Sequence, residues 1–302
     1  MIENKNELVS VVIVTYNSAK YVLETLDSIR TQTYDNIELI ITDDCSTDNT
    51  IYVCEEWLKE NKNHFERTLV LLAEKNQGIA ANCNKGIKQA QGKYLKMISG
   101  DDYISPDYLE KCVPAFLLET DCGMVYTNSF ILNEKTHQII NEDSTKYKSG
   151  KIFKEFFFLD FWPKGSCTLY KTDIIFEMNL YDESIWVEDY LLVLKIAEKY
   201  SIAHVDEYLS YYRLHDSNAG RDSIRLFESQ LQTIERFKNY LYFEKRKKII
   251  LKNLAQTASR ENVNYLIKLF FREKQIYFIT MFFKTIIKKN IKNVAKAFYN
   301  HH

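Results

Sequence analysis

The feature that most constrains the fold is a set of short runs of β-branched and aliphatic residues near the N-terminus. Two of them are 8–14 (LVSVVIV) and 37–42 (IELIIT), and such runs are typical of strands buried on both faces, as in a parallel sheet. Two further runs follow at 68–73 and 93–98. The segments between the runs repeat their apolar residues at helical spacing, over 18–30, 46–60 and 79–90. This alternation predicts βαβ units with right-handed crossovers.

The rest of the chain has a more mixed pattern. Pro106 suits the first turn of a helix, because a proline there loses no hydrogen bond. The expected elements after it are a strand at 123–130, a polar excursion at 131–151, an aromatic segment at 153–163, a helix at 186–200, a strand near 202–213 and helices from about 222 to the end.

Composition and charge are those of a globular chain with a basic C-terminal part. Of the 302 residues, 46% are hydrophobic and 27% are charged, which excludes global disorder. The near-zero net charge conceals an asymmetry, since residues 241–302 carry 14 Lys and Arg against 3 Asp and Glu, whereas residues 1–240 carry 26 against 38. This asymmetry predicts two functional parts.

Cysteine usage and hydropathy predict a cytoplasmic protein. The six cysteines show no C-x-x-C spacing and are typical of reduced, buried thiols. No run reaches the ~18 apolar residues that a membrane-spanning helix needs. The first residues, MIENKNELVS, predict no secretory signal.

Acidic and small polar residues cluster where the predicted buried strands end. These clusters are 15–17 (TYN), 43–48 (DDCSTD) and 99–102 (SGDD). Taken singly, each cluster also fits an ordinary turn or a helix cap. In an open α/β sheet, however, the carboxyl ends of the strands border the ligand crevice, and adjacent carboxylates need a counter-charge. A divalent cation that holds a diphosphate supplies one, and oxygen ligands suit Mg²⁺ or Mn²⁺.

These motifs resemble those of family 2 glycosyltransferases of the GT-A fold. The matching stretches lie, in order, within residues 8–218: VSVVIVTYNSAKYVLETLDSIRTQTYDNIELIITDDCSTDNT, NQGIAANCNKGIKQAQGKYLKMISGDDYISPDYLE, WVEDYLLVLKIA and YYRLHDSN. The resemblance implies an α/β fold, with a Rossmann-like nucleotide-diphospho-sugar transferase sheet flanked by helices. It also implies a catalytic domain at 1–220, with a donor half to about 102 and an acceptor half from about 103, followed by a basic helical extension at 221–302.

The resemblance further implies transfer of a sugar from a nucleotide diphosphate donor, by default a UDP-sugar, to an acceptor hydroxyl with inversion of the anomeric centre. It implies Mn²⁺ or Mg²⁺ as cofactor and a place in surface polysaccharide or glycoconjugate synthesis. The residue roles that it implies are nucleotide binding by Thr15, Tyr16, Asn17, Asp44 and Asp101, metal binding by Asp102 and His215, diphosphate binding by Arg213 and His215, and general-base catalysis by Asp189.

One position departs from the family pattern Asp-x-Asp-Asp, because Ser99 stands in place of the first aspartate. The metal site then rests on Asp101 and Asp102 with donor phosphates and water, which implies weaker or differently shared metal binding. Glu188 and Asp189 also fit first-turn carboxylates that the helix dipole favours. Lys75 precedes a helix whose N-terminus suits an anion, and a plain strand-end turn is the alternative.

The acceptor side and the C-terminal extension are less defined by sequence. Trp162, Trp186 and Glu188 are expected to border the acceptor, although the aromatic segment around Trp162 also fits a hydrophobic core. In 283–298, apolar residues and lysines recur at spacings of three and four, which predicts a helix with adjacent apolar and basic stripes. Such a helix binds an anionic membrane surface at the cytoplasmic face, or packs on the body or on a second copy. Nucleic-acid binding is disfavoured, since the body is acidic.

Two other classes stay open. A sugar-1-phosphate nucleotidyltransferase shares a similar fold but normally has a glycine-rich stretch after the first strand, which TYNSAKYVLE lacks. A catalytically weak nucleotide-sugar binding protein has only Ser99 in its favour. A dinucleotide dehydrogenase is disfavoured, because no G-x-G-x-x-G follows the first strand.

Overall fold

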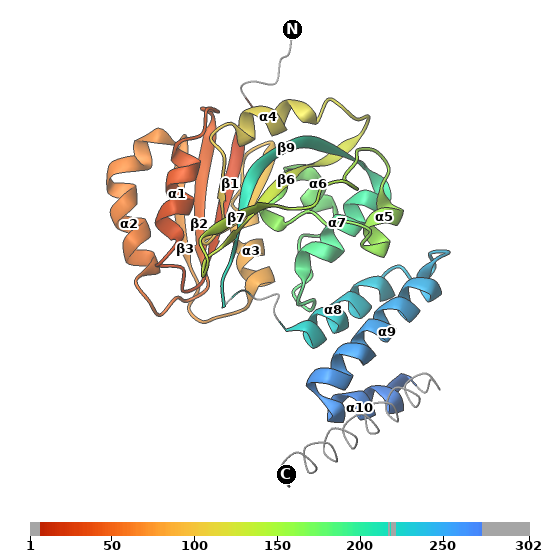
Figure 1. Ribbon diagram of the computed structural model, residues 1–302. Coiled ribbons are helices and arrows are strands. Elements are labelled where there is room, and N and C mark those ends of the chain that lie inside the picture. Colours follow the sequence, from red (N-terminus) through yellow and green to blue (C-terminus); the bar gives the residue numbers. More distant parts are fainter. Residues whose placement is uncertain (1–6, 217, 219–221, 274–302) are drawn as a thin grey trace. The chain divides into compact units, whose positions relative to one another are not determined.

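The computed structural model describes residues 7–216, 218 and 222–273 (Figure 1). The chain divides into two compact units, Met1–Asn218 and Ala219–His302.

The first unit is built on one mixed sheet, in which the described residues form nine strands. Their order is β3-β2-β1-β4-β8-β6-β9-β5, and β7 pairs with β6. The strands are β1 (Val9–Thr15), β2 (Ile37–Asp43), β3 (Arg67–Leu72), β4 (Tyr94–Ser99), β5 (Tyr103–Ile104), β6 (Cys122–Asn133), β7 (Gln138–Asn141), β8 (Thr168–Lys171) and β9 (Ser201–Leu214). The helices of this unit are α1 (Val22–Arg30), α2 (Thr50–Asn61), α3 (Ile79–Ile87), α4 (Tyr108–Ala115), α5 (Phe153–Phe158), α6 (Thr172–Glu177) and α7 (Glu188–Lys199), with short 3₁₀ turns η1 (Lys62–His64) and η2 (Gly165–Cys167).

The four N-terminal strands are parallel, as their sequence predicts. Val14 on β1 lies opposite Thr42 on β2 and Ser99 on β4, so the three polar clusters leave the sheet at one edge. β1, β2 and β4 are buried along almost their whole length, because helices cover both faces of a parallel sheet. The predicted α/β architecture is confirmed.

The second half of this unit differs from the sequence expectation in several places, which include the unpredicted strand β5 and helix α6. β8 was not predicted, and it pairs antiparallel with both β4 and β6. The excursion at 131–151 contains the edge strand β7, whose four residues are all exposed. The aromatic segment contains the short helix α5, in which Phe156 and Phe157 are buried.

The second unit consists, in its described part, of helices α8 (Ser223–Glu235), α9 (Phe243–Glu261) and α10 (Val263–Glu273). Asp222 caps α8 by accepting a hydrogen bond from the Arg225 backbone N–H at 2.9 Å, and α9 buries Ile250, Leu254 and Ala258. The striped segment expected at 283–298 lies outside the described residues. Within the described ranges, every helix is too short or too polar to cross a membrane.

A buried carboxylate organises the amino-terminal end of the sheet. Glu38 on β2 is fully buried and accepts hydrogen bonds from the Ser10 hydroxyl, from Arg67 Nε at 2.8 Å and from the Gln91 and Gly92 backbone N–H groups at 2.5 and 3.1 Å. A Cβ on Gly92 would come within 2.5 Å of the Ser10 backbone nitrogen. Glu38 therefore ties β1, β2 and β3 to the turn that precedes β4.

We expect Glu38→Ala to lower the free energy of unfolding by about 3 kcal/mol, because four donors lose their acceptor and two of them, the Ser10 hydroxyl and the Gly92 backbone N–H, are buried. Urea denaturation of the two proteins measures this change. Glu66→Ala is the matched control, since Glu66 is exposed one residue before β3, and it should shift stability by less than about 0.5 kcal/mol. Equal losses in both variants would contradict the assignment.

Candidate functional site

The end of β2 carries two aspartates that are held by backbone and hydroxyl donors. Asp43 accepts hydrogen bonds from Thr15 Oγ1 at 2.8 Å and from the Ser46 backbone N–H at 2.7 Å. Asp44 accepts one bond on each oxygen, from the backbone N–H groups of Gln77 and Gly78, both at 2.8 Å. Asp44 thus fixes the loop that enters α3. Lys75 lies exposed on this same loop.

The turn after β1 is built around Asn17. This residue has a positive φ of 52°, its side chain accepts a hydrogen bond from the Thr47 backbone N–H at 2.8 Å, and its own N–H donates to Ser46 Oγ at 2.8 Å. The Thr15 side chain points inward to Asp43, whereas Tyr16 is 49% exposed. Of the three residues on this turn that were predicted to bind the nucleotide, Thr15 is buried, whereas Tyr16 and Asn17 are exposed.

The end of β4 is packed directly against this turn. A Cβ on Gly100 would lie 2.8 Å from Thr15 Cγ2 and 3.1 Å from Ser18 Cβ, so only a glycine lets the two strand ends approach so closely. Asp102 follows and is buried. Its Oδ1 accepts a hydrogen bond from the Arg213 backbone N–H at 2.8 Å. Burial, followed by the neighbouring charge of Asp101, raises the pKa of Asp102 well above its usual value.

The end of β9 completes this cluster. His215 Nε2 lies 2.8 Å from Asp101 Oδ2, and the Arg213 guanidinium donates to the Asp101 carbonyl oxygen at 2.8 Å, to Glu134 at 3.0 Å and to Glu24. The structure thus places Arg213 and His215 in contact with Asp101 and Asp102. It also shows that protein groups occupy all three guanidinium nitrogens of Arg213, which the sequence did not reveal.

These residues suit a divalent cation as partial ligands. The Asp102 carboxylate is buried without a basic side chain bonded to it in the described chain, and its raised pKa reflects that cost, which a metal ion would offset. Asp101 adds carboxylate oxygens and His215 an imidazole nitrogen. In the described ranges, no three His, Cys, Asp or Glu side chains are grouped closely enough to hold a metal ion, so Asp101, Asp102 and His215 do not form a complete metal site by themselves.

Helix α7 presents Glu188 and Asp189 in its first turn. Burial raises the pKa of both carboxyl groups, and the charge of Asp189 adds to the rise at Glu188. Asp189 Oδ1 is buried and has no hydrogen-bond partner among the described residues. The Trp162 side chain and the Lys164 charge lower the pKa of Asp189, against the larger effect of its burial. An unsatisfied buried carboxylate oxygen is costly, and such groups call for a functional explanation.

Helix α3 connects the strand ends with the segment before α7, and sequence reasoning missed its role. Asn82 donates to the carbonyl oxygens of Thr15 and Thr42 at 3.2 and 3.0 Å. Asn84 donates to Tyr181 O and to Glu183 Oε1, each at 3.0 Å. The available signal was two asparagines in NQGIAANCNKGI, since buried amides are found where backbone groups need partners.

Two more contacts place this helix within the site. Lys85 donates to the Asp43 carbonyl oxygen at 2.9 Å. The charges of Glu188, Asp189 and Asp44 all help to raise the pKa of the buried Cys83 thiol, after the larger effect of its burial. Helix α3 is therefore common to the strand-end cluster and to the start of α7.

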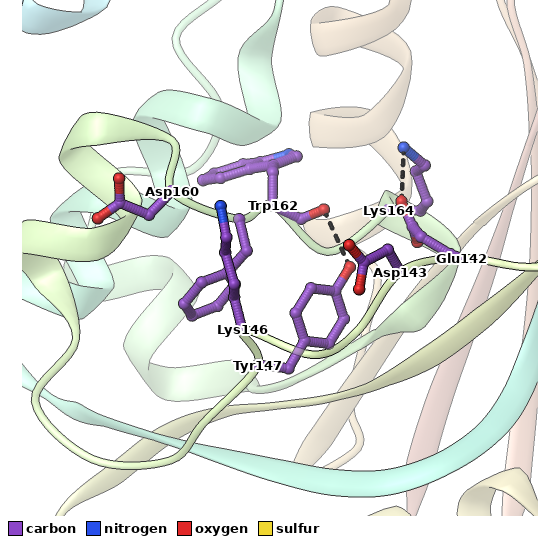
Figure 2. Close-up of a pocket in the computed structure, with 8 residues that line it drawn as sticks. Glu142, Asp143, Lys146, Tyr147, Asp160, Trp162 and Lys164 are labelled. Carbon is purple, nitrogen blue, oxygen red and sulfur yellow. Dashed lines mark hydrogen bonds and ion pairs between the residues drawn. The ribbon is translucent and has the colours of Figure 1, made fainter.

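The tryptophans predicted at the acceptor side have different settings. Trp162 packs edge-on against Tyr190 of α7, with ring centroids 5.0 Å apart, and lines a pocket (Figure 2). Trp186 lies in the turn before α7 and is not among the residues that line this pocket.

Comparison with known proteins identifies the family. The sequence profile described as "Glycosyl transferase family 2" matches residues 10–175. A putative glycosyltransferase, EpsH of Bacillus subtilis, is 31% identical over 242 residues, which cover 75% of this chain and 67% of EpsH. An uncharacterized glycosyltransferase of Rickettsia felis is 31% identical over 214 residues, which cover 68% of this chain but only 33% of that protein. The chain belongs to glycosyltransferase family 2.

Solved structures agree on the fold. S. aureus TarS 1–349 in complex with UDP superposes with a TM-score of 0.62 at 20% identity, covering 92% of this chain and 81% of TarS 1–349. The mannosyltransferase PcManGT from Pyrobaculum calidifontis, in complex with GDP-Man and Mn²⁺, gives a TM-score of 0.62 at 16% identity, covering 96% and 87%. The chain has the GT-A fold of these transferases.

A buried lysine supports the segment that carries Trp162 and Lys164. Lys96 on β4 is fully buried, and its Nζ donates to Thr168 O at 3.2 Å and to Ser166 O, and lies 3.2 Å from the Tyr108 hydroxyl. These bonds hold η2 and the start of β8 against β4. Burial lowers the pKa of Lys96 from 10.5 to about 8.

Because the pKa of Lys96 is lower in the folded than in the unfolded chain, the unfolded chain binds more protons at this residue between pH 8 and pH 10.5. The stability of the wild type should therefore rise with pH relative to Lys96→Met across this window, by about 3 kcal/mol at most. Urea denaturation of both proteins at several pH values measures the difference. A difference that stays flat or falls with pH would contradict the lowered pKa of Lys96 in the folded chain.

Proposed function

We propose that this chain is an inverting glycosyltransferase that moves a sugar from a UDP-sugar to an acceptor hydroxyl. The observation that carries the proposal is the buried, unpartnered Oδ1 of Asp189 in a carboxylate pair at the start of α7. An alcohol is a poor nucleophile, so a positioned base has to remove its proton as the new bond forms. A single displacement of this kind needs one base and no carboxylate nucleophile.

In this proposal Asp189 accepts the proton of the acceptor hydroxyl at its free oxygen. Glu188 lies next to it, and the negative charges of the two carboxylates repel each other. Two interacting carboxyl groups lose their protons as a pair rather than independently. A proton held on Glu188 leaves the negative charge on Asp189, where the base is needed.

The donor would lie along the strand-end edge, with the nucleotide at Thr15, Tyr16, Asn17, Asp44, Lys75 and Asp101. Exposed Tyr16 offers a ring for the base, and Asp44 holds the loop that carries Lys75. The complex of TarS 1–349 with UDP supports a uridine nucleotide as donor. The complex of PcManGT with GDP-Man shows that a protein of the same fold also binds a guanosine nucleotide.

Asp102, Asp101 and His215 would hold Mn²⁺ or Mg²⁺, which would stabilise the charge of the leaving diphosphate. The Mn²⁺ complex of the mannosyltransferase neighbour supports this cofactor. Because Glu134, Glu24 and the Asp101 carbonyl oxygen engage Arg213, this residue would place the Asp101–Asp102 turn and add positive charge beside the diphosphate.

The remaining proposals concern the cellular role. We place the catalytic domain at 1–220 and the basic extension at 221–302. The acceptor would be a glycan or a lipid-linked sugar of a surface polysaccharide. The extension would contact the cytoplasmic face of the membrane or a second copy, and Lys245–Lys248 on α9 supply part of its charge.

Asp189→Asn should lower kcat for sugar transfer by roughly 100- to 10,000-fold, the usual range for loss of a general base, while UDP binding changes little. A transfer assay with UDP-sugars and calorimetric titration with UDP measure the two effects. Asp173→Asn is the matched control, because Asp173 occupies the first turn of the neighbouring helix α6. Unchanged turnover in Asp189→Asn, or a product with retained anomeric configuration by NMR, would contradict the proposal.

UDP should raise the melting temperature more with Mn²⁺ than without it, whereas GDP, dTDP and CMP should have smaller effects. A ligand at 100 times its Kd adds about 2.7 kcal/mol of stability. Differential scanning fluorimetry of the wild type and of Asp102→Ala makes the comparison, and the variant should lose the metal-dependent part of the shift. A larger shift with another nucleotide would overturn the UDP assignment.

A further inference from the structure

A pocket of about 270 Å³ lies beside α7, lined by residues from the segment after β7 and from the segment after α5 (Figure 2). Its volume is just below the usual range for ligand pockets, which is roughly 300–1,000 Å³. This space suits one sugar ring better than a longer glycan. Its aromatic wall includes Tyr147 and Trp162, and its polar wall includes Glu142, Lys146 and Asp160.

The pocket adjoins the proposed base through two of its own residues. Trp162 packs on Tyr190, the residue after Asp189, and both the Trp162 side chain and the Lys164 charge act on the Asp189 carboxylate. The Tyr147 hydroxyl donates to the Trp162 carbonyl oxygen at 3.3 Å, so the two segments are held together. A molecule in this pocket is therefore next to the residues that surround Asp189.

The charges around the pocket distinguish between ligand classes. Lys164 is paired with Glu142 at 2.9 Å, and Asp143 accepts hydrogen bonds from the Thr145 backbone N–H and hydroxyl at 3.0 and 2.7 Å. Lys146 and Asp160 make no side-chain ion pair or hydrogen bond with the described residues. The Lys146 ammonium can therefore donate to a ligand, and the Asp160 carboxylate can accept from it. The lining as a whole has three carboxylates and two lysines, so its net charge is negative.

We propose that this pocket binds the terminal sugar of the acceptor, and that this sugar is a neutral pyranose. Its hydroxyls donate to Asp160 and accept from Lys146, which a hydroxyl group can do because it is both donor and acceptor. An additional carboxylate or phosphate on the ring would meet the excess negative charge of the lining. The assignment of this sugar as the acceptor rests on the proposed function. Binding of a neutral sugar in the pocket does not depend on turnover and can be measured separately.

Saturation-transfer NMR on the full chain tests binding directly, with methyl β-D-glucopyranoside, methyl β-D-galactopyranoside and methyl 2-acetamido-2-deoxy-β-D-glucopyranoside as neutral probes. Methyl β-D-glucuronide is the anionic probe. At least one neutral glycoside should bind, more tightly than the glucuronide, and Asp160→Ala and Lys146→Ala should each weaken it about tenfold, since each removes a charge-assisted hydrogen bond. The control variants Asp35→Asn and Lys88→Ala, exposed on the same unit, should bind like the wild type.

Any of three results would contradict the proposal that this pocket binds a neutral sugar. The first is that no neutral glycoside binds at millimolar concentration, and the second is that the glucuronide binds more tightly. The third is that Asp160→Ala and Lys146→Ala bind the glycosides as the control variants do. Kinetics separate this failure from failure of the proposed function. If the wild type transfers sugar but the two pocket variants keep the acceptor KM of the wild type, the function stands and the pocket is wrong. If the glycosides bind as expected but no UDP-sugar is turned over, the pocket stands and the transferase proposal is wrong.

Discussion

The structure depends on how its buried carboxylates are satisfied. Glu38 at the amino end of the sheet has four donors, and Asp43 and Asp44 at the carboxyl end are satisfied by hydroxyl and backbone donors. Asp102 has a backbone donor but stays buried with a raised pKa. Asp189 keeps one buried oxygen without a partner among the described residues. The two least satisfied of these carboxylates are thus those proposed to hold the metal ion and to act as the base.

The Arg213 cluster shows why the two halves of the sheet form one site. β9 is several strands away from β4 in the sheet order, yet its end returns to Asp101 and Asp102. The Arg213 backbone N–H binds the Asp102 side chain, and its guanidinium binds the Asp101 carbonyl oxygen. Glu24 on α1 and Glu134 in the turn after β6 accept hydrogen bonds from the guanidinium. A charge-assisted network of this kind fixes geometry as well as adding stability.

Local pattern predicted the parallel half of the fold, because strands buried on both faces read as continuous apolar runs. It placed Thr15, Asp44, Asp102 and Asp189 at strand ends and at a helix start, where the structure has them. It missed β8, whose four residues carry no period long enough to be recognised. It also missed the partners of Arg213, since Glu24 lies 189 residues away in the chain and only tertiary folding brings the two together. The nucleotide, metal and base roles of these residues remain predictions.

The pocket could not be predicted from the sequence either, because its two walls come from segments that only tertiary folding brings together. Trp162 stands in an aromatic segment, and such segments most often form core. Here Phe156 and Phe157 do form core, whereas Trp162 lines a cavity whose other wall comes from residues after an exposed edge strand. Lys96 makes this arrangement possible, because a buried ammonium binds two carbonyl oxygens of the turn that follows Trp162. Burying that charge is costly, and the two carbonyl oxygens and the Tyr108 hydroxyl around the Lys96 ammonium offset part of the cost.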